Sequence, residues 1–498
     1  MSTLYDQYKT TLQKHADIEH SIAILQWDKE VNAPTKGSDM RARQLATLSG
    51  MAHELMTDNA FGDLLQQLDE KSDQLAFAQA KNIKGSLKEY QREKKYSTDF
   101  VMRRSRVVSN TYDAWLKARE ANDYKLYKEA LKQMVELKIE ETEVLGYDGH
   151  PYNALIEEFE PGAKVADIDK LFTDVRQRLV AFAAQLKEAT QVDNAFLKRH
   201  FPKSKQWDFG IHLLKNMGYD FEAGRQDISA HPFTTSFGSR DVRVTTRIDE
   251  QDFGNMTWSC IHEGGHALYE QGLPATEYGL PSGKYISLGI HESQSRLWEN
   301  NVGRSLPYWR AHYKDLQKVF PESLGDISIN DFYKGINRVE PSLIRTEADE
   351  IHYHLHVLIR YEIEKAMLEG KAPLDSLDEY WNAKYKEYLG VDVPDDRRGI
   401  LQDIHWAHGS IGYFPTYSLG SFYAAQFFQQ AKKDIPSLLT HIEAGNNAPL
   451  LEWLGEKVFQ HGRNYSAQEL CERITGEALN FDYFMDYIEE KYRNIYEL

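Results

Sequence analysis

The most informative part of the sequence reads SCIHEGGHALY, at residues 259–269. It contains the pattern His-Glu-x-x-His. On a helix this spacing places His262 and His266 one turn apart on one face, where both imidazoles can reach one zinc ion. Glu263, beside the first histidine, is suited to take a proton from water acidified by the metal and to pass it to a leaving amine. The stretch therefore predicts a helix that carries a zinc-dependent hydrolytic site.

The residues around this pattern indicate that the helix is buried. Ile261, Ala267 and Leu268 are apolar. The two adjacent glycines would each cost a helix about 1 kcal/mol unless neighbouring backbone approaches closely. A buried histidine pair beside a buried carboxylate needs a compensating charge, and a divalent cation supplies it. Cys260 points to another face of the helix, so we interpret it as a small buried thiol.

A third ligand must come from elsewhere in the chain. The metzincin pattern fails, because Tyr269 and Gly272 occupy the positions of its glycine and its third histidine. Glu270 lies two turns from His262 on the same helix, too far along the axis to share the metal. Glu277 falls in a predicted loop. None of these residues completes the site.

The next predicted helix, residues 287–300, offers two better-placed carboxylates. Glu292 and Glu299 could both reach the zinc helix if the two helices pack together, and spacing alone does not decide between them. His291 could orient a ligand histidine from behind, although a hydrogen-bonded structural role is the more common fate of such a residue.

Most of the remaining chain shows helical periodicity. Apolar residues recur at helical spacing over 4–25, 127–145 and 165–182, which predicts three long helices. The alternating, β-branched sequence DVRVTTRI at 241–248 instead predicts a strand. We find no linker, fixed-period repeat or low-complexity tract. The expectation is one catalytic domain over residues 1–498, mainly α-helical, with a small sheet in mid-chain.

Composition narrows the possible partners. The chain has 498 residues, with 59 Lys and Arg against 76 Asp and Glu, a formal net charge of −17. This charge repels phosphate backbones and anionic lipid, so we expect neither nucleic acid nor a membrane as a partner. The first ten residues lack the pattern of a secretory signal, and two cysteines suit a reducing compartment. We therefore expect a cytoplasmic protein.

Six short motifs follow one another along the chain. They are HPF at 231–233, DxRxT at 241–245, HExxH at 262–266, HESQ at 291–294, IRxxAD at 344–349 and GxxQDxHW at 399–406. Together they resemble the motif set of the carboxypeptidase Taq family of zinc metallocarboxypeptidases. The resemblance implies a mainly α-helical fold with a deep groove between two helical lobes, and a small sheet lining that groove.

The same resemblance implies chemistry. It points to one zinc ion per chain, with cobalt as a possible substitute, and to Glu292 as the third ligand. It also implies a homodimer. The implied activity removes C-terminal amino acids from peptides one at a time, with broad specificity and poor use of C-terminal proline.

An exopeptidase of this kind must bind the free α-carboxylate of its substrate, which calls for a guanidinium. We choose Arg345, on a segment predicted to be helical. The alternative is a structural ion pair between Arg345 and Glu347 or Asp349. Arg243 could likewise hold the peptide, but pairing with Asp241 is slightly favoured.

Other residues could contact the substrate or its transition state. Tyr413, Tyr417 and His405 are candidate donors to the developing oxyanion, because a phenol and an imidazolium can both donate a hydrogen bond. His231, before Pro232, is a further candidate for substrate binding.

Two other functions remain open at this point. A helical oligopeptidase or dipeptidyl carboxypeptidase would share the His-Glu-x-x-His pattern but release dipeptides or internal fragments. A metal-free, peptide-binding helical scaffold would show no turnover that depends on Glu263.

Overall fold

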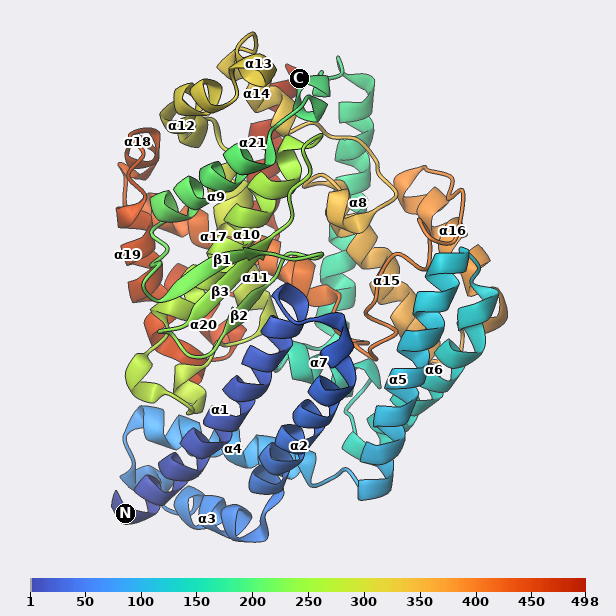
Figure 1. The fold of residues 1–498 in the computed structure, drawn as a ribbon, viewed down its shortest axis with the longest axis vertical. Coiled ribbons are helices and arrows are strands. Elements are labelled where there is room, and N and C mark those ends of the chain that lie inside the picture. Colours follow the sequence, from blue (N-terminus) through green and yellow to red (C-terminus); the bar gives the residue numbers. More distant parts are fainter. Residues whose placement is uncertain (1) are drawn as a thin grey trace. The chain divides into compact units, whose positions relative to one another are not determined.

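The computed structural model describes residues 2–498 and is mainly α-helical with one small sheet (Figure 1). Met1, the first residue of the predicted domain, lies outside the described residues. The fold class expected from the sequence is confirmed, while the single-domain boundary stays a prediction. The chain forms two compact units, and each unit is assembled from three segments. The first unit contains Met1–Lys94, Asp193–Ile336 and Tyr423–Asn480, and the second contains Lys95–Val192, Asn337–Phe422 and Phe481–Leu498.

The first unit holds the sheet and most of the helices. Its elements are α1 (Ser2–Val31), α2 (Ser38–Thr57), α3 (Asn59–Asp69), α4 (Phe77–Glu93), α9 (Lys203–Met217), β1 (Gly224–Ile228), β2 (Thr234–Ser236), β3 (Val242–Thr246), α10 (Phe253–Gly272), α11 (Leu288–Arg296), α12 (Leu306–Val319), α13 (Pro321–Leu324), α14 (Ile329–Ile336), α18 (Leu438–Glu443), α19 (Ala448–Lys457) and α20 (Ala467–Thr475).

The second unit contains helices and no strands among the residues that the structure describes. Its helices are α5 (Thr98–Ala121), α6 (Lys125–Leu145), α7 (Tyr152–Phe159), α8 (Val165–Glu188), α15 (His352–Leu368), α16 (Leu377–Leu389) and α21 (Asp482–Tyr496). One further helix, α17 (Pro415–Asp434), begins in this unit and ends in the first. The three long helices predicted from periodicity are confirmed as α1, α6 and α8.

The sheet in the first unit is larger than the single predicted strand. In the described chain it has three strands in the order β1-β3-β2, with β1 parallel and β2 antiparallel to the central β3. Val242 and Val244 of β3 are buried, which fits the predicted alternation. The strand ends at Thr246, two residues before the predicted end. β1 precedes the β-branched region and was not predicted.

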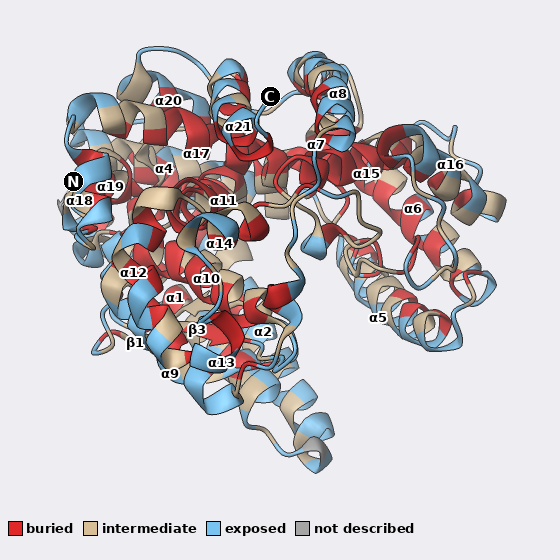
Figure 2. Ribbon diagram, turned by 90° about the horizontal axis from the view of Figure 1, so that it is seen from above, coloured by how far each residue is buried: buried red, intermediate tan, exposed pale blue. Residues whose placement is uncertain are grey.

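Helix α10 contains the His-Glu-x-x-His pattern and is mostly buried, as Figure 2 shows by its red ribbon. Its first turn is capped by Asp252, whose side chain accepts a hydrogen bond from the backbone N–H of Gly254 at 2.9 Å. Ile261, Ala267 and Leu268 are all at most 3% exposed, so the predicted burial of this helix is confirmed.

The two glycines of the pattern sit where neighbouring helices approach α10. A Cβ at Gly265 would lie 2.7 Å from the backbone oxygen of Gln294 and from the Cα of Ser295, both on α11. A Cβ at Gly264 would instead meet side-chain ends of Leu214 and Met217 on α9, at 2.8 and 2.9 Å. Gly265 therefore permits backbone-to-backbone contact, and Gly264 permits side-chain packing.

Helix α11 starts at a cap and ends in an unusual turn. The Ser287 side chain accepts a hydrogen bond from the backbone N–H of Ile290 at 3.1 Å. The helix then continues as a π-helix over Leu297–Gly303. Such turns are rare and are frequent at functional sites.

The segment that carries Arg345 is not one continuous helix, contrary to the prediction. Arg345–Glu347 form a single 3-10 turn, and α15 begins only at His352. The intervening Asp349 accepts hydrogen bonds from the backbone N–H groups of Ile351 and His352, both at 2.9 Å, and so caps α15.

Gly265→Ala is expected to destabilise the protein more than Gly264→Ala. The added methyl at position 265 meets backbone atoms that can move only with α11, at a cost of about 1–3 kcal/mol. At position 264 it meets flexible side-chain ends, and the better helix propensity of alanine offsets much of the strain. Denaturant unfolding of both variants measures the difference. Equal midpoints would contradict the close approach at Gly265.

Candidate metal centre

Three side chains predicted as metal ligands converge in the first unit. The potential ligand atoms of His262, His266 and Glu292 all lie within 4.8 Å of one another. Oε2 of Glu292 is 3.8 Å from Nε2 of His262 and 3.5 Å from Nε2 of His266. Two imidazoles and one carboxylate are a donor set that zinc and other divalent ions accept, so the residues present fit such an ion.

Glu299, the other carboxylate left open by the sequence, lies behind one of the histidines. Its Oε2 is 2.9 Å from Nδ1 of His262, on the ring edge away from Glu292. Burial opposes ionisation, but Arg296, His262 and Arg304 outweigh it and hold the pKa of Glu299 well below its usual range. The ionised Glu299 therefore accepts a hydrogen bond from a protonated Nδ1 of His262, which orients Nε2 of that ring towards Glu292.

His266 is backed by a longer chain of hydrogen bonds. Its Nδ1 lies 2.6 Å from Nδ1 of His291, and Nε2 of His291 lies 2.9 Å from Oε1 of Glu270. Burial lowers the pKa of His266 to about 3, so its ring is neutral. A proton on Nδ1 of His266 then donates to His291, whose Nε2–H donates to Glu270. His291 thus lies behind His266, in the orienting position that the sequence offered as the less favoured of its two roles.

Glu263 is buried beside these ligands and held by the sheet. The hydroxyl of Thr234, on the edge strand β2, donates to Oε2 of Glu263 at 2.6 Å. Burial raises the pKa of Glu263, although His262 and Thr234 act in the opposite direction. A carboxylate with a raised pKa accepts a proton more readily, which suits a general base.

Cys260 and Arg243 are two residues for which the sequence favoured a structural role. Cys260 is 2% exposed, and burial raises its pKa to about 12, which confirms a buried, inert thiol. Arg243 donates from Nε and Nη2 to the two carboxylate oxygens of Asp241, both at 2.8 Å. The guanidinium also lies over the Trp27 ring, 4.4 Å from its centroid. This is the structural arrangement that the sequence slightly favoured. His231 is exposed.

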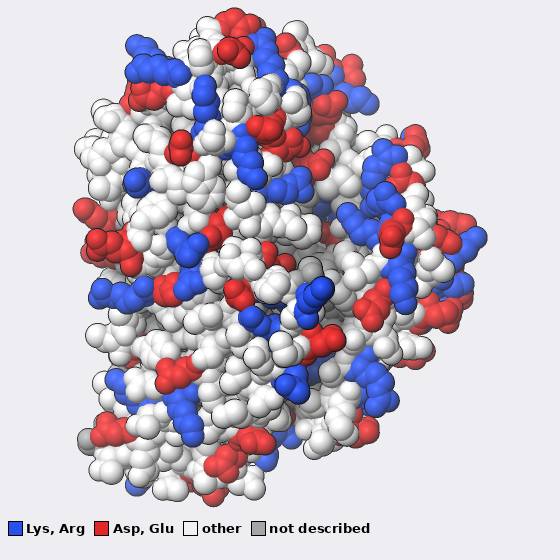
Figure 3. Space-filling view, in the orientation of Figure 1, with Lys and Arg blue, Asp and Glu red and all other residues white. Residues whose placement is uncertain are grey.

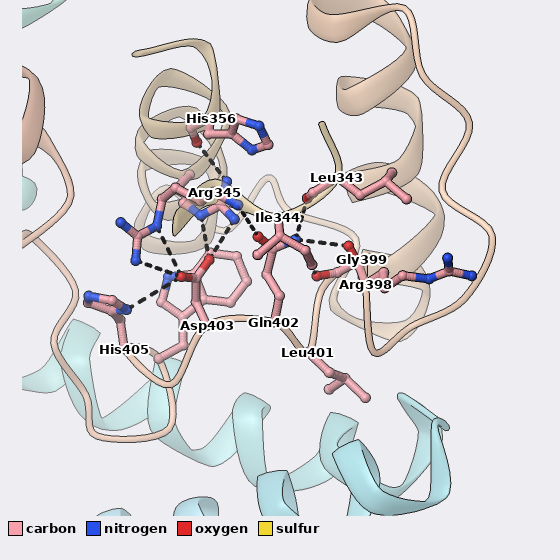
Figure 4. Close-up of polar contacts among 12 residues, drawn as sticks. Leu343, Ile344, Arg345, His356, Arg398, Gly399, Leu401, Gln402, Asp403 and His405 are labelled. Carbon is pink, nitrogen blue, oxygen red and sulfur yellow. Dashed lines mark hydrogen bonds and ion pairs between the residues drawn. The ribbon is translucent and has the colours of Figure 1, made fainter. Parts of the chain in front are cut away.

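A second polar cluster surrounds Arg345 in the second unit (Figure 4). Arg345 donates from Nε and Nη2 to Oδ1 of Asp403, at 3.1 and 3.0 Å, and from Nη1 to the Tyr353 hydroxyl at 3.3 Å. Arg360 donates to the other oxygen, Oδ2, at 2.6 Å. The backbone N–H of Arg345 donates to the side chain of Gln402 at 3.0 Å.

The ion-pair partners proposed for Arg345 from sequence were wrong. The guanidinium pairs with Asp403, 58 positions along the chain, instead of Glu347 or Asp349. Asp349 pairs with His352 at 2.6 Å. Burial opposes ionisation of Asp403, but the nearby arginines keep its pKa well below the usual range.

The aromatic candidates gather beside this cluster. His405 Nε2 lies 3.1 Å from the Tyr417 hydroxyl, and the Tyr413 ring lies 5.1 Å from that of Tyr417. Burial lowers the pKa of His405 to about 3, so its ring is a neutral imidazole. A neutral imidazole still carries one N–H, so the role of His405 as a donor to the oxyanion stays a prediction.

Glu364, on α15, anchors the segment that follows Asp403. Its carboxylate accepts hydrogen bonds from the Trp406 indole at 2.9 Å, the Tyr152 hydroxyl at 2.7 Å and the backbone N–H of Gly412 at 3.2 Å. Burial raises the pKa of Glu364 to about 7, against the effect of these donors.

Known proteins resemble this chain along nearly its whole length. The family model described as Carboxypeptidase Taq (M32) metallopeptidase matches residues 7–492. The chain belongs to this M32 family. Carboxypeptidase 1 of Bacillus subtilis is 38% identical over 497 residues, covering 100% of this chain and 99% of the relative. Thermostable carboxypeptidase 1 of Thermus thermophilus is 39% identical over 487 residues, covering 95% of each.

A solved structure agrees with these relatives. The M32 carboxypeptidase from Deinococcus radiodurans R1 superposes with a TM-score of 0.97 at 38% identity, and each chain is covered completely, at 100%. Membership of the family makes this chain a peptidase of the metallocarboxypeptidase type and implies a divalent metal. The oligopeptidase alternative and the metal-free scaffold are not favoured.

Sequence reasoning missed several residues of the candidate metal centre and of the cluster around Arg345. Thr234 directly follows the HPF motif, yet nothing in the sequence indicates that its hydroxyl reaches Glu263. Arg296 stands four positions after Glu292, a spacing that favours contact on one helix face and could have revealed it. Asp403 lies within the GxxQDxHW motif but received no role.

Glu364 should contribute to the pH dependence of the free energy of unfolding. Its folded pKa of about 7 exceeds the usual 4.5, so between these values the native state binds more protons than the unfolded state. The free energy of unfolding should therefore fall as pH rises from 4.5 to 7, by about 3 kcal/mol from this group. Glu364→Gln should remove that component of the slope. Parallel pH profiles for the two proteins, measured by denaturant unfolding, would contradict the assignment.

Proposed function

We propose that this M32 metallopeptidase is a zinc-dependent carboxypeptidase that releases single C-terminal amino acids with broad specificity, and that cobalt can replace zinc. The observation that most supports this proposal is the convergence of His262, His266 and Glu292, with Glu263 held beside them by Thr234. The relatives are named carboxypeptidases, which supports this type of cleavage.

In the proposed mechanism, a bound divalent ion supplies Lewis acidity for attack on the scissile carbonyl. Glu263 removes a proton from the attacking water and later delivers it to the departing amino group. Thr234 fixes one oxygen of Glu263 and leaves the other available for this transfer. Glu299 and the His291–Glu270 pair fix the two histidine rings, so that both Nε2 atoms remain aimed at the same point.

We propose that Arg345 receives the α-carboxylate of the substrate. A guanidinium has five N–H donors. Two of those of Arg345 bond to the single oxygen Oδ1 of Asp403 and one bonds to the Tyr353 hydroxyl, so three of the five are engaged. Two arginines share one aspartate, and His405 is neutral, so the cluster keeps an excess positive charge. An arriving carboxylate would balance that charge.

Other assignments stay proposals. Tyr413, Tyr417 and His405 are candidate donors to the developing oxyanion, and His231 and Arg243 are candidate contacts for the peptide. We also propose a cytoplasmic homodimer, on the grounds of the reducing-compartment composition and the family resemblance.

Among residues 2–498, none of the helices combines the length and apolar character of a membrane span. On the face drawn in Figure 3, basic and acidic side chains are interspersed.

Metal removal and product analysis test the proposed function. The purified protein is incubated with a peptide blocked at its N-terminus, and products are followed by mass spectrometry. We expect a ladder that loses one C-terminal residue at a time. Chelation should abolish it, and zinc or cobalt should restore it. Glu263→Gln should lower kcat by about 100-fold or more while the protein still binds metal. Release of dipeptides or internal fragments would overturn the proposal.

Arg345→Met should erase the preference for a free C-terminus. For the wild type, kcat/KM should be much higher for a peptide acid than for the matching peptide amide, because only the acid carries a carboxylate. In the variant the value for the acid should fall by about 100-fold, whereas the value for the amide changes little. The ratio of the two values does not depend on the fraction of folded enzyme. An unchanged ratio would assign Arg345 to a purely structural ion pair with Asp403.

A further inference from the structure

Arg296 bridges two carboxylates at the candidate metal centre. Its Nε donates to Oε1 of Glu292 at 2.6 Å, and its Nη1 donates to Oε2 of Glu299 at 3.1 Å. The three side chains are between 7% and 14% exposed. Each bond joins a guanidinium to a carboxylate in a largely dry environment, where such bonds are short and strong.

The contact with Glu292 distinguishes its two oxygens. Oε1 is occupied by Arg296, whereas Oε2 is the atom that faces Nε2 of both histidines. We propose that Arg296 is a positioning residue that restricts Glu292 to binding the metal through Oε2 alone. A carboxylate limited to one oxygen leaves an open coordination position, as catalytic zinc sites require. This inference rests on the proposed metal site.

The local backbone explains how one side chain reaches both carboxylates. Glu292 and Arg296 are four residues apart on α11, so they share one face of the helix. Glu299 follows three residues later in the π-helix and lies on the same side. The planar guanidinium offers separate N–H donors to each acceptor, which the single ammonium of a lysine does not match.

Arg304 provides a matched control within the same segment. Its Nη2 donates to Oε1 of Glu299 at 3.2 Å, and its Nη1 donates to the backbone oxygen of Ile336 at 2.7 Å. Both arginines contact Glu299, but of the two only Arg296 has a described contact with Glu292. Replacing either arginine by methionine removes one positive charge near the site. Only Arg296→Met frees Oε1 of Glu292.

Charge and position act in opposite directions on metal affinity. Loss of a positive charge strengthens the attraction of the site for a divalent cation. Loss of the hydrogen bond from Arg296 leaves Glu292 less firmly positioned. Affinity alone therefore does not separate the two effects. Coordination number does, because it depends on which oxygens of Glu292 reach the metal.

Cobalt(II) titration of the metal-depleted full-length protein tests the proposal. The visible d–d absorption of cobalt is strong in four-coordinate sites and weak in five-coordinate ones. Arg296→Met should bind one cobalt with a band about twofold or more weaker than that of the wild type. Arg304→Met should keep the wild-type band. The activity of the cobalt form of Arg296→Met should fall by about 10-fold or more, mainly in kcat.

Two further variants keep the outcome decisive. Arg296→Gln repeats the test if Arg296→Met does not fold, since its shorter neutral amide lacks the guanidinium fork. His266→Ala should abolish the cobalt band, which ties the signal to the proposed site. A wild-type band in a folded Arg296 variant, or an equal loss in Arg304→Met, would overturn the role of Arg296 while leaving the metal site intact. A wild-type protein that binds no cobalt would overturn both.

Discussion

The close approach of α10 and α11 is the constraint on which the metal centre depends. Gly265 lets the backbone of α10 lie against the backbone of α11 at Gln294 and Ser295, where any side chain would separate them. This contact brings Glu292 opposite the two histidines. A glycine in the middle of a helix costs stability, but here it allows two helices to bring together the residues of one candidate metal site. The site is therefore a product of packing as much as of the His-Glu-x-x-His pattern.

Around this contact, hydrogen bonds and ion pairs hold the buried polar side chains. Glu299 sits between His262 and two arginines, and the His291–Glu270 pair backs His266. Each ligand histidine is thus fixed by an acceptor on its far edge, directly in one case and through a second imidazole in the other. Neither arrangement requires the metal to hold the rings in place, so the protein presents a largely formed site.

The sequence predicted the parts of this molecule that local spacing controls. Helix α10, its two histidines, the long helices and the strand β3 all follow from periodicity or from a motif. The partners supplied by tertiary structure were harder to predict. Asp403 reaches Arg345 from 58 positions away, and Thr234 reaches Glu263 across the edge of the sheet. Such contacts depend on how elements pack, which residue spacing does not encode. Spacing alone left Glu292 and Glu299 open as the third ligand, and the family motifs pointed to Glu292.

The interleaved path of the chain has a consequence for synthesis. The first unit needs Met1–Lys94, Asp193–Ile336 and Tyr423–Asn480, so it cannot be completed until Asn480 has left the ribosome. Its N-terminal helices must wait for partners made hundreds of residues later, with apolar surface exposed meanwhile. Contacts so distant in sequence slow folding and favour aggregation of the nascent chain. No single cut in the chain releases either unit intact.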